Sequence, residues 1–332
     1  MRIVVDGMGG DKGSKEVLKG IVLALKEKED IEVIVVGQEE KLSKIIKEMG
    51  YSNERLKIVN ADEVIEMTDE PMIAVREKKK SSINVGLDLV KNKQGDAFIS
   101  SGNTGALISA SQLKLRRIKG ILRPAIATVF PSKKGHIVFM DVGANADTKP
   151  EYINQFAIMG SEFAKEILNI TSPKVSLLNI GSEEGKGNEI TRQAYELLKE
   201  NKNISFTGNI ESREMMSGDT DVIVSDGFTG NMVLKTSEGV ANYIFSMLKE
   251  EIQKSFLSKI GVLFLKKPLR KMKNKLDSSE YGGALFLGLN GISIKAHGNS
   301  DYIGIKNAIM VADNFAKNNF VEKLKNTINN NK

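Results

Sequence analysis

Short apolar runs alternate along the chain with longer segments whose apolar residues recur every three to four positions. A short apolar run predicts a buried strand, and a period near 3.6 residues predicts an amphipathic helix. The predicted strands cover residues 2–5, 31–36, 56–59, 97–99, 126–130, 136–140, 175–178, 204–207, 222–224 and 292–296. The predicted helices cover residues 14–28, 41–49, 71–80, 83–93, 106–117, 150–168 and 188–199, then a segment from 231 to beyond 247, and a last one that ends near 318.

This alternation predicts a three-layer α/β/α fold, Rossmann-like, in which a largely parallel sheet carries helices on both faces. The strands at 126–130 and 136–140 form a hairpin signal within that pattern. The Asn- and Lys-rich tail after residue 318 is expected to fray. We expect a single catalytic domain over 1–332, made of two related halves, with a projecting amphipathic and basic helical segment at 248–280.

An internal repeat recurs at an offset of 125 residues. Residues 96–105 and 221–230 both read Asp, three strand residues and Ser-x-Gly-x-Thr-Gly, and an apolar helical pattern follows each copy. Glycine allows close backbone approach, and a helix start offers free N–H groups, so each copy is typical of an anion site. The alternative is that Thr104 and Thr229 only cap their helices. The repetition favours ligand groups between two halves, at the carboxyl ends of strands.

Polar loops follow six predicted strands, and we expect them to gather at one edge of the sheet and to form one cleft. They lie at 6–11, 100–105, 141–147, 179–188, 226–231 and 297–301. Loop 6–11 lacks the third glycine of a dinucleotide fingerprint, so a tight turn is its alternative reading. Loop 179–188 lacks the glycine spacing of a P-loop, but its Lys186, between glycines and before a helix, is well placed for an anion.

Composition excludes several kinds of chemistry. With no cysteine, the chain has no disulfide, no cysteine nucleophile and no thiolate metal site, and with only two histidines a histidine zinc site is not expected. We therefore predict no metal and no cofactor. The chain starts with a strand rather than a signal peptide, and no apolar run approaches about 18 residues, so a cytoplasmic protein is expected.

The excess positive charge lies in residues 252–276, which contain eight Lys or Arg and no acid, whereas the rest of the chain carries a net charge of −2. Phe256, Ile260 and Phe264 recur there every four residues, a pattern typical of an interfacial helix on anionic lipid. The alternatives are an ordinary surface helix and a nucleic-acid patch. Nucleic acid is disfavoured, because apolar side chains add nothing to phosphate contacts. An acidic carrier protein could share this surface.

The loop sequences resemble those of the bacterial acyl-acyl carrier protein:phosphate acyltransferases, which open phospholipid synthesis. The matching motifs are Asp6-Gly-Met-Gly-Gly-Asp11, Ser101-Gly-Asn-Thr-Gly105, Asp141-Val-Gly-Ala-Asn145, Asn179-Ile-Gly-Ser-Glu-Glu-Gly-Lys-Gly-Asn188, Ser225-Asp-Gly-Phe-Thr-Gly-Asn231 and Lys295-Ala-His-Gly-Asn-Ser-Asp301. Gly7 is a departure, because the family more often carries alanine there.

The resemblance implies transfer of a fatty acyl group from acyl carrier protein to inorganic phosphate. It further implies the fold of phosphate acetyltransferases and isopropylmalate dehydrogenases, a homodimer, and peripheral attachment to the inner face of the membrane. A downstream glycerol-3-phosphate acyltransferase is a further expected partner, and nucleic acid is not.

Such a reaction needs a positioned phosphate and a stabilised oxyanion more than it needs a strong acid or base. With no cysteine for a relay, direct attack of phosphate on the thioester is the simpler mechanism. The catalytic candidates are Lys186, Asn231, Asp226 and His297, whereas His136, inside a strand, is expected to be structural. The substrate-binding candidates are Asp6, Gly9, Gly10, Asp11, Ser101, Gly102, Asn103, Thr104, Gly105, Asn145, Asn179, Gly227, Thr229, Gly230 and Asn299.

Three other functions stay open at this point. A phosphate acetyltransferase using coenzyme A has no reason to carry the basic apolar segment. A decarboxylating dehydrogenase of the same fold needs an aspartate cluster for a divalent metal and a nicotinamide site, and neither can be recognised in the sequence. A non-catalytic membrane scaffold is disfavoured by the six polar loops, but only a turnover measurement distinguishes a scaffold from an enzyme.

Overall fold

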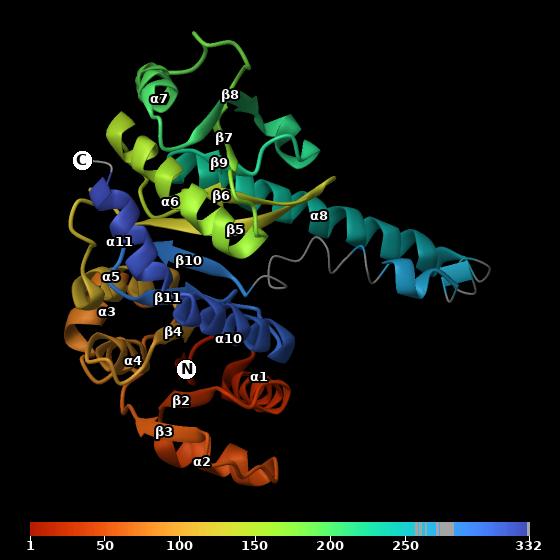
Figure 1. Cartoon of the computed structure of the whole chain (residues 1–332). Coiled ribbons are helices and arrows are strands. Elements are labelled where there is room, and N and C mark those ends of the chain that lie inside the picture. Colours follow the sequence, from red (N-terminus) through yellow and green to blue (C-terminus); the bar gives the residue numbers. More distant parts are fainter. Residues whose placement is uncertain (256–257, 259–260, 263, 270–271, 273–281, 331–332) are drawn as a thin grey trace.

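The computed structural model in Figure 1 describes residues 1–255, 258, 261–262, 264–269, 272 and 282–330. Their strands are β1 (Arg2–Asp6), β2 (Glu32–Gly37), β3 (Leu56–Asn60), β4 (Ala97–Ser100), β5 (Ala125–Ser132), β6 (Gly135–Met140), β7 (Lys174–Asn179), β8 (Ser205–Glu211), β9 (Val222–Val224), β10 (Ala284–Leu287) and β11 (Ile292–Lys295). Their α-helices are α1 (Gly13–Glu27), α2 (Glu39–Glu48), α3 (Pro71–Glu77), α4 (Ser82–Lys91), α5 (Thr104–Leu115), α6 (Pro150–Leu168), α7 (Glu189–Glu200), α8 (Gly227–Lys254), α10 (Tyr302–Lys317) and α11 (Phe320–Asn330).

All the described strands join one sheet, in the order β3-β2-β1-β4-β11-β10-β5-β6-β9-β7-β8. Helices cover both faces, so the predicted three-layer α/β/α architecture is confirmed (Figure 1). The face covered by α1, α6, α10 and α11, here the α1 face, buries residues such as Val5, Met140 and Ile294. The opposite face, here the α5 face, buries Phe98 and Phe139, and α4 and α5 pack over its β1, β4 and β11 strands.

Strand direction divides the sheet into two parallel groups. β1 to β4 and β11 run one way, and β6 to β9 form the second group. Between the groups, β10 is antiparallel to β11 and to β5, and β5 is antiparallel to β6. The second group therefore runs opposite to the first. The hairpin between β5 and β6 causes the reversal, because the chain turns back there before it builds the second group.

This reversal makes one sequence-based expectation wrong. The six polar loops leave the sheet in two opposite directions, so they do not gather at one edge. The strand β10 was also absent from the predicted elements, because it is short and lies among glycines.

The C-terminal tail is a helix rather than a frayed end. α11 buries Phe320, Leu324 and Ile328, which recur every four residues, and the ring of Phe320 packs edge-on against those of Phe163 and Phe315. This apolar stripe holds the last turns against α6 and α10, so the expectation of a frayed tail is wrong.

The long helix α8 leaves the body of the molecule, and its C-terminal half stands clear of the sheet (Figure 1). Of the predicted membrane-contact residues, Phe264 is described and 83% exposed, whereas Phe256 and Ile260 lie outside the described residues, as does much of 248–280. Within the described part of the chain, no helix is long and apolar enough to cross a membrane.

Candidate functional site

Three of the polar loops pack together where β1, β4 and β11 end, and we call loops 6–11, 100–105 and 297–301 the first cluster. The backbone N–H of Asp11 donates to the carbonyl of Gly298 at 2.8 Å. A side chain at Gly9 would have its Cβ 2.6 Å from the backbone nitrogen of Gly102, so these two loops touch main chain to main chain. Only glycine permits this approach.

The carboxylate of Asp6 holds the first cluster together through hydrogen bonds. It accepts hydrogen bonds from the N–H groups of Met8 at 3.0 Å and Gly9 at 3.2 Å, and from the Ser100 hydroxyl at 2.6 Å. Asp6 is 1% exposed. Its bonds are internal to the cluster, so Asp6 positions the loop rather than touching a ligand.

A buried lysine lies at the centre of the first cluster. The Lys295 side chain donates hydrogen bonds to the carbonyl oxygens of Ala296 at 2.6 Å and Ser101 at 3.2 Å. Among the described residues it forms no ion pair with any carboxylate. Burial lowers the pKa of Lys295 to about 8, against the smaller raising effect of the Asp6 and Asp11 charges.

The ammonium of Lys295 is therefore charged at neutral pH and lacks a counterion within bonding distance. A buried charge without a partner is costly, and proteins retain one where a ligand neutralises it. Lys295 was not among the predicted site residues. The sequence did contain a signal, because Lys295 occupies a position of the apolar strand β11 whose side chain points into the protein. A lysine at the end of a strand is, however, easily mistaken for a surface residue.

Loops 141–147 and 226–231 pack together in the same way where β6 and β9 end, and we call them the second cluster. The Asp141 carboxylate accepts from the backbone N–H groups of Ile126, Gly143, Ala144 and Asn145 at 2.9–3.1 Å, and from the Asn145 amide at 2.8 Å. Burial nevertheless raises the pKa of Asp141, because desolvation outweighs those bonds.

Close contacts between main-chain segments hold the second cluster together as well. The N–H of Gly227 donates to the carbonyl of Asn145 at 2.8 Å, and a Cβ at Gly230 would lie 1.9 Å from the carbonyl oxygen of Asp141. The Asn145 amide is used within the protein, because it also donates to the Pro124 carbonyl at 2.9 Å. Asn145 therefore supports the loop, as Asp141 does.

The two clusters share a strand register. Val5 faces Ile99 across β1 and β4, and Met140 faces Val224 across β6 and β9. At the next position along these strands, Asp6 lies beside Ser100, and Asp141 lies beside Ser225. Ser100 and Ser225 are equivalent positions of the sequence repeat.

The helices after the two repeat copies begin at different positions. Asn103 caps α5 by accepting from the N–H of Ala106 at 3.0 Å, and its amide donates to three carbonyls of residues 66–69. Asp226 caps α8 by accepting from the N–H of Thr229 at 2.7 Å and from the Thr229 hydroxyl at 2.7 Å. Neither Thr104 nor Thr229 is the N-cap residue.

Both clusters open on the α5 face, on either side of β10 and β5. Three strand spacings separate β11 from β6, which is about 14 Å. The helix α8 spans this interval: Asn231 lies beside Gly143 in the second cluster, and the charge of Lys235, one turn later, lowers the pKa of Lys295. The first turns of α8 therefore link the two clusters on this face of the sheet.

The described contacts of loop 179–188 lie within the loop and toward β8 rather than toward either cluster. The side chain of Lys186 is 51% exposed, and its ammonium lies 3.9 Å from Glu183. The Asn179 amide donates to the Lys186 carbonyl at 3.0 Å and to Asn209 of β8 at 3.1 Å. The described contacts of this loop thus run toward β8, at the far side of the second group.

His297 and Asn299 lie in the exposed turn after β11. The ring Nδ1 of His297 accepts from the backbone N–H of Asn299 at 3.2 Å. His136 lies within β6, as the sequence indicated. In the part of the chain that the structure describes, no group of three or more Asp, Glu or His side chains is placed to hold a metal ion.

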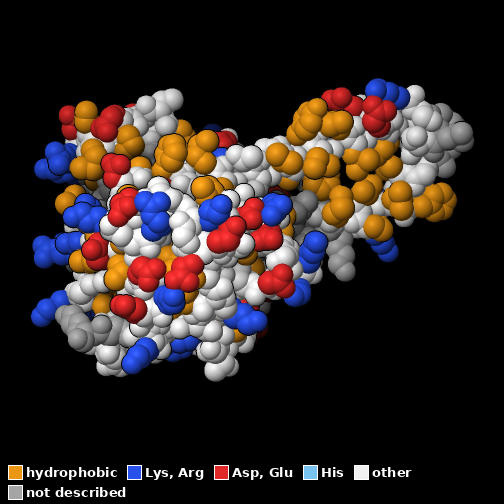
Figure 2. Space-filling model, turned by 90° about the horizontal axis from the view of Figure 1, so that it is seen from above, with side chains coloured by type: hydrophobic (Ala, Val, Ile, Leu, Met, Phe, Trp, Pro, Cys, Tyr) orange, Lys and Arg blue, Asp and Glu red, His pale blue; other side chains and the backbone are white. Residues whose placement is uncertain are grey.

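A further surface lies along the projecting arm, where Figure 2 shows apolar side chains gathered on α8 and beyond it. Its exposed apolar residues on α8 are Phe228, Met232, Val240, Tyr243, Ile244, Met247 and Leu248. Beyond α8, Phe264 and Leu265 are exposed next to Lys266 and Lys267. An apolar surface of this length on a monomer is typical of an interaction site.

Comparison with known proteins gives close relatives over the whole chain. The family model described as "Fatty acid synthesis protein" matches residues 1–323. A phosphate acyltransferase of Fusobacterium nucleatum is 55% identical over 329 residues, which is 99% of each chain. A phosphate acyltransferase of Clostridium perfringens is 49% identical over 328 residues, 99% of this chain and 97% of that one.

Solved structures share the fold at low sequence identity. A phosphotransacetylase from Streptococcus pyogenes has a TM-score of 0.63 at 17% identity, with 96% of this chain and 94% of that chain covered. A branched-chain phosphotransacylase from Enterococcus faecalis has a TM-score of 0.58 at 13% identity, with 95% and 99% covered. The expected kinship in fold to phosphate acetyltransferases is confirmed.

Proposed function

The chain belongs to the fatty acid synthesis protein family, whose matched relatives are phosphate acyltransferases, and we propose that it moves a fatty acyl group from an acyl carrier protein thioester to inorganic phosphate. It is an acyltransferase, with acyl transfer involving phosphate as its reaction type. The observation that carries the proposal is Lys295, a buried cation without a carboxylate partner among the described residues, surrounded by glycine-lined loops.

The first cluster is the proposed phosphate site. The ammonium of Lys295 neutralises the phosphate, and the close-packed glycine backbone lets N–H groups reach it. The start of α5 adds the positive end of a helix dipole. The ligand-facing residues of this site would be Gly9, Gly10, Asp11, Ser101, Gly102, Thr104 and Gly105.

The second cluster is the proposed site for the thioester carbonyl. Gly227, Thr229 and Gly230 lie in the first turn of α8, and Asn231 follows them. N–H groups at a helix start and an Asn amide can stabilise the oxyanion that develops in the transition state. Asp6, Asn103, Asn145 and Asp226 act by holding the loops, because their hydrogen bonds are spent inside the protein.

The proposed chemical step is direct attack. A phosphate oxygen forms a bond to the thioester carbonyl carbon, the carbon–sulfur bond breaks, and the electron pair leaves with the carrier's thiolate. The products are acyl phosphate and the free thiol carrier. A thiol with a pKa near 8.5 leaves without a strong acid, so no general acid is required. Lys186 and His297 stay proposals as a second cation and as an orienting group.

The proposed homodimer rests on the apolar stripe of α8. Val240, Tyr243, Ile244 and Met247 follow the i, i+3, i+4, i+7 spacing of one helix face and are exposed. A second copy of the same helix would cover this stripe with a matching surface, as two-fold symmetry requires.

The proposed membrane contact lies at the far end of the arm. Phe264 and Leu265 expose apolar area beside Lys266 and Lys267, a combination suited to anionic lipid. Phe256 and Ile260 stay part of this proposal from the sequence alone. The same basic segment suits an acidic acyl carrier protein. Acyl phosphate is reactive, so a glycerol-3-phosphate acyltransferase that consumes it nearby is a further proposed partner.

We further propose that the single domain consists of two related halves. The shared register of Asp6 with Ser100 and of Asp141 with Ser225 supports this, as do the paired strand, loop and helix units.

The deciding experiment is turnover. Purified protein is incubated with acyl-acyl carrier protein and labelled phosphate, and acyl phosphate is trapped with hydroxylamine. Phosphate-dependent release of carrier thiol with matching acyl phosphate supports the proposal. Thiol release without phosphate, or no release, contradicts it. A parallel reaction with acetyl-coenzyme A separates it from a phosphate acetyltransferase.

A further inference from the structure

A loop with four exposed cations follows α5, and we call residues 116–123 the basic loop. Residues 114–123 contain five Lys or Arg and no acid. The first of them, Lys114, is paired with Asp88 at 2.6 Å. The other four are exposed, and in the part of the chain that the structure describes none of them lies within ion-pair distance of a carboxylate: Arg116, Arg117, Lys119 and Arg123. The basic loop therefore carries positive charge that no neighbouring carboxylate compensates.

The backbone of the basic loop is fixed to the body of the protein. Ile118 and Ile121 are buried, so the loop is anchored by apolar side chains three residues apart. The side-chain amide of Gln155 on α6 accepts from the N–H of Leu122 at 2.7 Å and donates to the carbonyl of Gly120 at 2.8 Å. The cations lie between these anchors, so their charges are presented to solvent from a backbone that is already in place.

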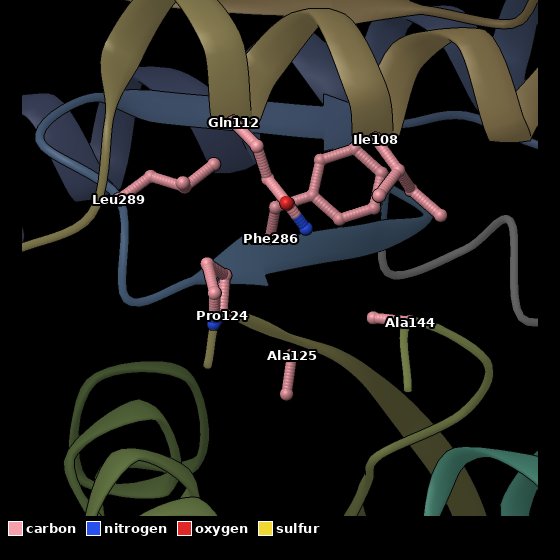
Figure 3. A pocket seen from close by; sticks show the side chains of 7 residues that line it. All are labelled: Ile108, Gln112, Pro124, Ala125, Ala144, Phe286 and Leu289. Carbon is pink, nitrogen blue, oxygen red and sulfur yellow. The ribbon is translucent and has the colours of Figure 1, made fainter. Parts of the chain in front are cut away.

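The basic loop ends beside the second cluster. Pro124 directly follows the loop, and the Asn145 amide donates to the Pro124 carbonyl at 2.9 Å. Figure 3 shows Pro124, directly before β5, and Ala144, of loop 141–147, around one small crevice. The guanidinium carbon of Arg123 lies 5.9 Å from the ring centroid of Tyr152 on α6, a cation–π contact that positions this side chain. The basic loop therefore adjoins the proposed site for the thioester carbonyl.

We propose that the basic loop is the docking surface for the acidic carrier protein that brings the thioester; the proposal rests on the acyl transfer proposed above. A carrier protein holds its thioester at the end of a flexible prosthetic group, so it must dock close to the site where the carbonyl reacts. Cations without carboxylate partners complement an acidic surface and speed its association. Leu122, 42% exposed among these cations, offers an apolar contact.

Two other basic surfaces suit this role less well. In the run 76–80, two of the lysines are already paired with the carboxylates of Asp62 and Asp69. On the arm, α8 extends about 35 Å from Asn231 to Lys254, at about 1.5 Å per residue. The described residues after α8 lie near its outer end (Figure 1). The length of the arm therefore separates its basic residues from the second cluster of the same chain.

The first test measures carrier binding without turnover, by fluorescence anisotropy of a labelled holo-acyl carrier protein in the absence of phosphate. The loop variant reverses three exposed charges together: Arg116→Glu, Arg117→Glu and Lys119→Glu. Its affinity for the carrier should be at least about tenfold below that of the wild type, and less sensitive to salt. The control makes the same charge change at three exposed lysines of α2, beside the edge strand β3: Lys41→Glu, Lys44→Glu and Lys47→Glu. The control should bind as the wild type does. Equal weakening in both variants, no weakening in the loop variant, or a wild type that does not bind the carrier at low salt would overturn the assignment.

The second test locates the loss in the kinetics. The loop variant should raise KM for a palmitoyl carrier thioester at least about tenfold and keep kcat within about threefold, because the basic loop meets the carrier and not the reacting atoms. A lowered kcat with an unchanged KM would contradict the docking role. If the triple variant does not unfold cooperatively in urea, Arg116→Gln with Lys119→Gln takes its place, and the carrier Kd and KM should then each rise about threefold.

The docking surface and the reaction fail separately. If Lys266→Glu with Lys267→Glu lowers carrier affinity and the loop variant does not, the arm is the docking surface and the assignment to the basic loop is wrong. If carrier binding depends on the basic loop but the wild type makes no acyl phosphate, the reaction is wrong and the docking surface stands. If the wild type turns over but neither Kd nor KM responds to the loop variant, the docking surface is wrong and the reaction stands.

Discussion

Lys295 donates a hydrogen bond to the backbone carbonyl of Ser101 at 3.2 Å, so the buried cation rests on the main chain of the loop that carries the first copy of the repeat. A main-chain carbonyl supplies only a partial negative charge. The position of Lys295 is thus fixed while its charge stays available to an anion.

Lys295→Met should lower activity and raise stability. The variant removes the buried ammonium and fills nearly the same volume, so kcat/KM for phosphate should fall at least about 100-fold, the scale of losing one transition-state contact. The free energy of unfolding should rise at neutral pH, because a desolvated charge without a counterion is removed. Steady-state kinetics and urea unfolding measure both effects. The exposed, paired Lys199→Met is the control and should change neither. Unchanged kinetics in Lys295→Met would remove Lys295 from the site.

Activity and stability should respond to pH in opposite senses above pH 8. Lys295 has a pKa of about 8, so kcat/KM for phosphate should fall about tenfold per unit above pH 8 as the ammonium loses its proton. The folded pKa lies below the unfolded value of about 10.4, so the unfolded state binds more protons between those values. The contribution of Lys295 to the free energy of unfolding therefore rises from pH 8 to about 10.4.

The difference between wild type and Lys295→Met isolates this residue from the other lysines. Such a comparison is needed because paired Lys317 and Lys199 have raised pKa values and lose stabilisation as pH rises above them. A stability difference that stays constant from pH 7 to pH 10 would contradict the shifted pKa.

Lys186→Ala tests the cation that the sequence favoured. If Lys186 neutralises phosphate or the oxyanion, turnover should fall about 100-fold or more. The free energy of unfolding should stay within about 0.5 kcal/mol, because the side chain is half exposed and its ion pair with Glu183 is loose. Activity within a few-fold of wild type would leave Lys295 as the proposed phosphate cation on its own.

Phe264→Glu combined with Leu265→Glu should release the protein from anionic vesicles. Both side chains are exposed on the arm, and the change replaces apolar area by negative charge beside Lys266 and Lys267. Co-sedimentation at low and high salt measures the effect, and Leu113→Glu on the body is the control. Turnover without lipid should be unchanged. A double variant that still sediments would refute the membrane contact, and lost turnover would assign the segment to carrier binding.

Ile244→Glu should weaken the proposed homodimer. Ile244 is 54% exposed in the middle of the α8 stripe, and a glutamate there would be buried without a partner in a helix-to-helix interface. Sedimentation velocity should show a shift toward monomer. Ser246→Glu, on another side of α8, should keep the wild-type mass. A monomeric wild type would refute the interface at once.

Local patterns predicted the elements well, because periodicity depends on neighbours in sequence. The direction of the second group depends on long-range pairing, and there the prediction of one edge failed. The hairpin at 126–140 was visible, but its consequence requires knowing that β10 and β11 enter between β4 and β5. No pattern within residues 284–295 encodes that position.

The candidate site was found as a set of loops, but roles within it were assigned less well. Asn103 and Asp226 stand directly before helices, and their capping bonds follow from that position. Lys295 was quoted within a motif and not singled out, because its burial arises only when β11 is covered by α5 and joined to β4.

The sheet is completed out of order. Nine of the eleven described strands are translated by residue 224, yet β4 and β5 are joined through β11 and β10 only once the chain has reached residue 295. Until then a growing chain presents two unpaired inner edges, and unpaired edges are where chains associate wrongly. The strands β10 and β11 therefore join the two parts of the sheet. Premature termination before β10 would leave two separated sheets, each with an exposed edge of apolar strands.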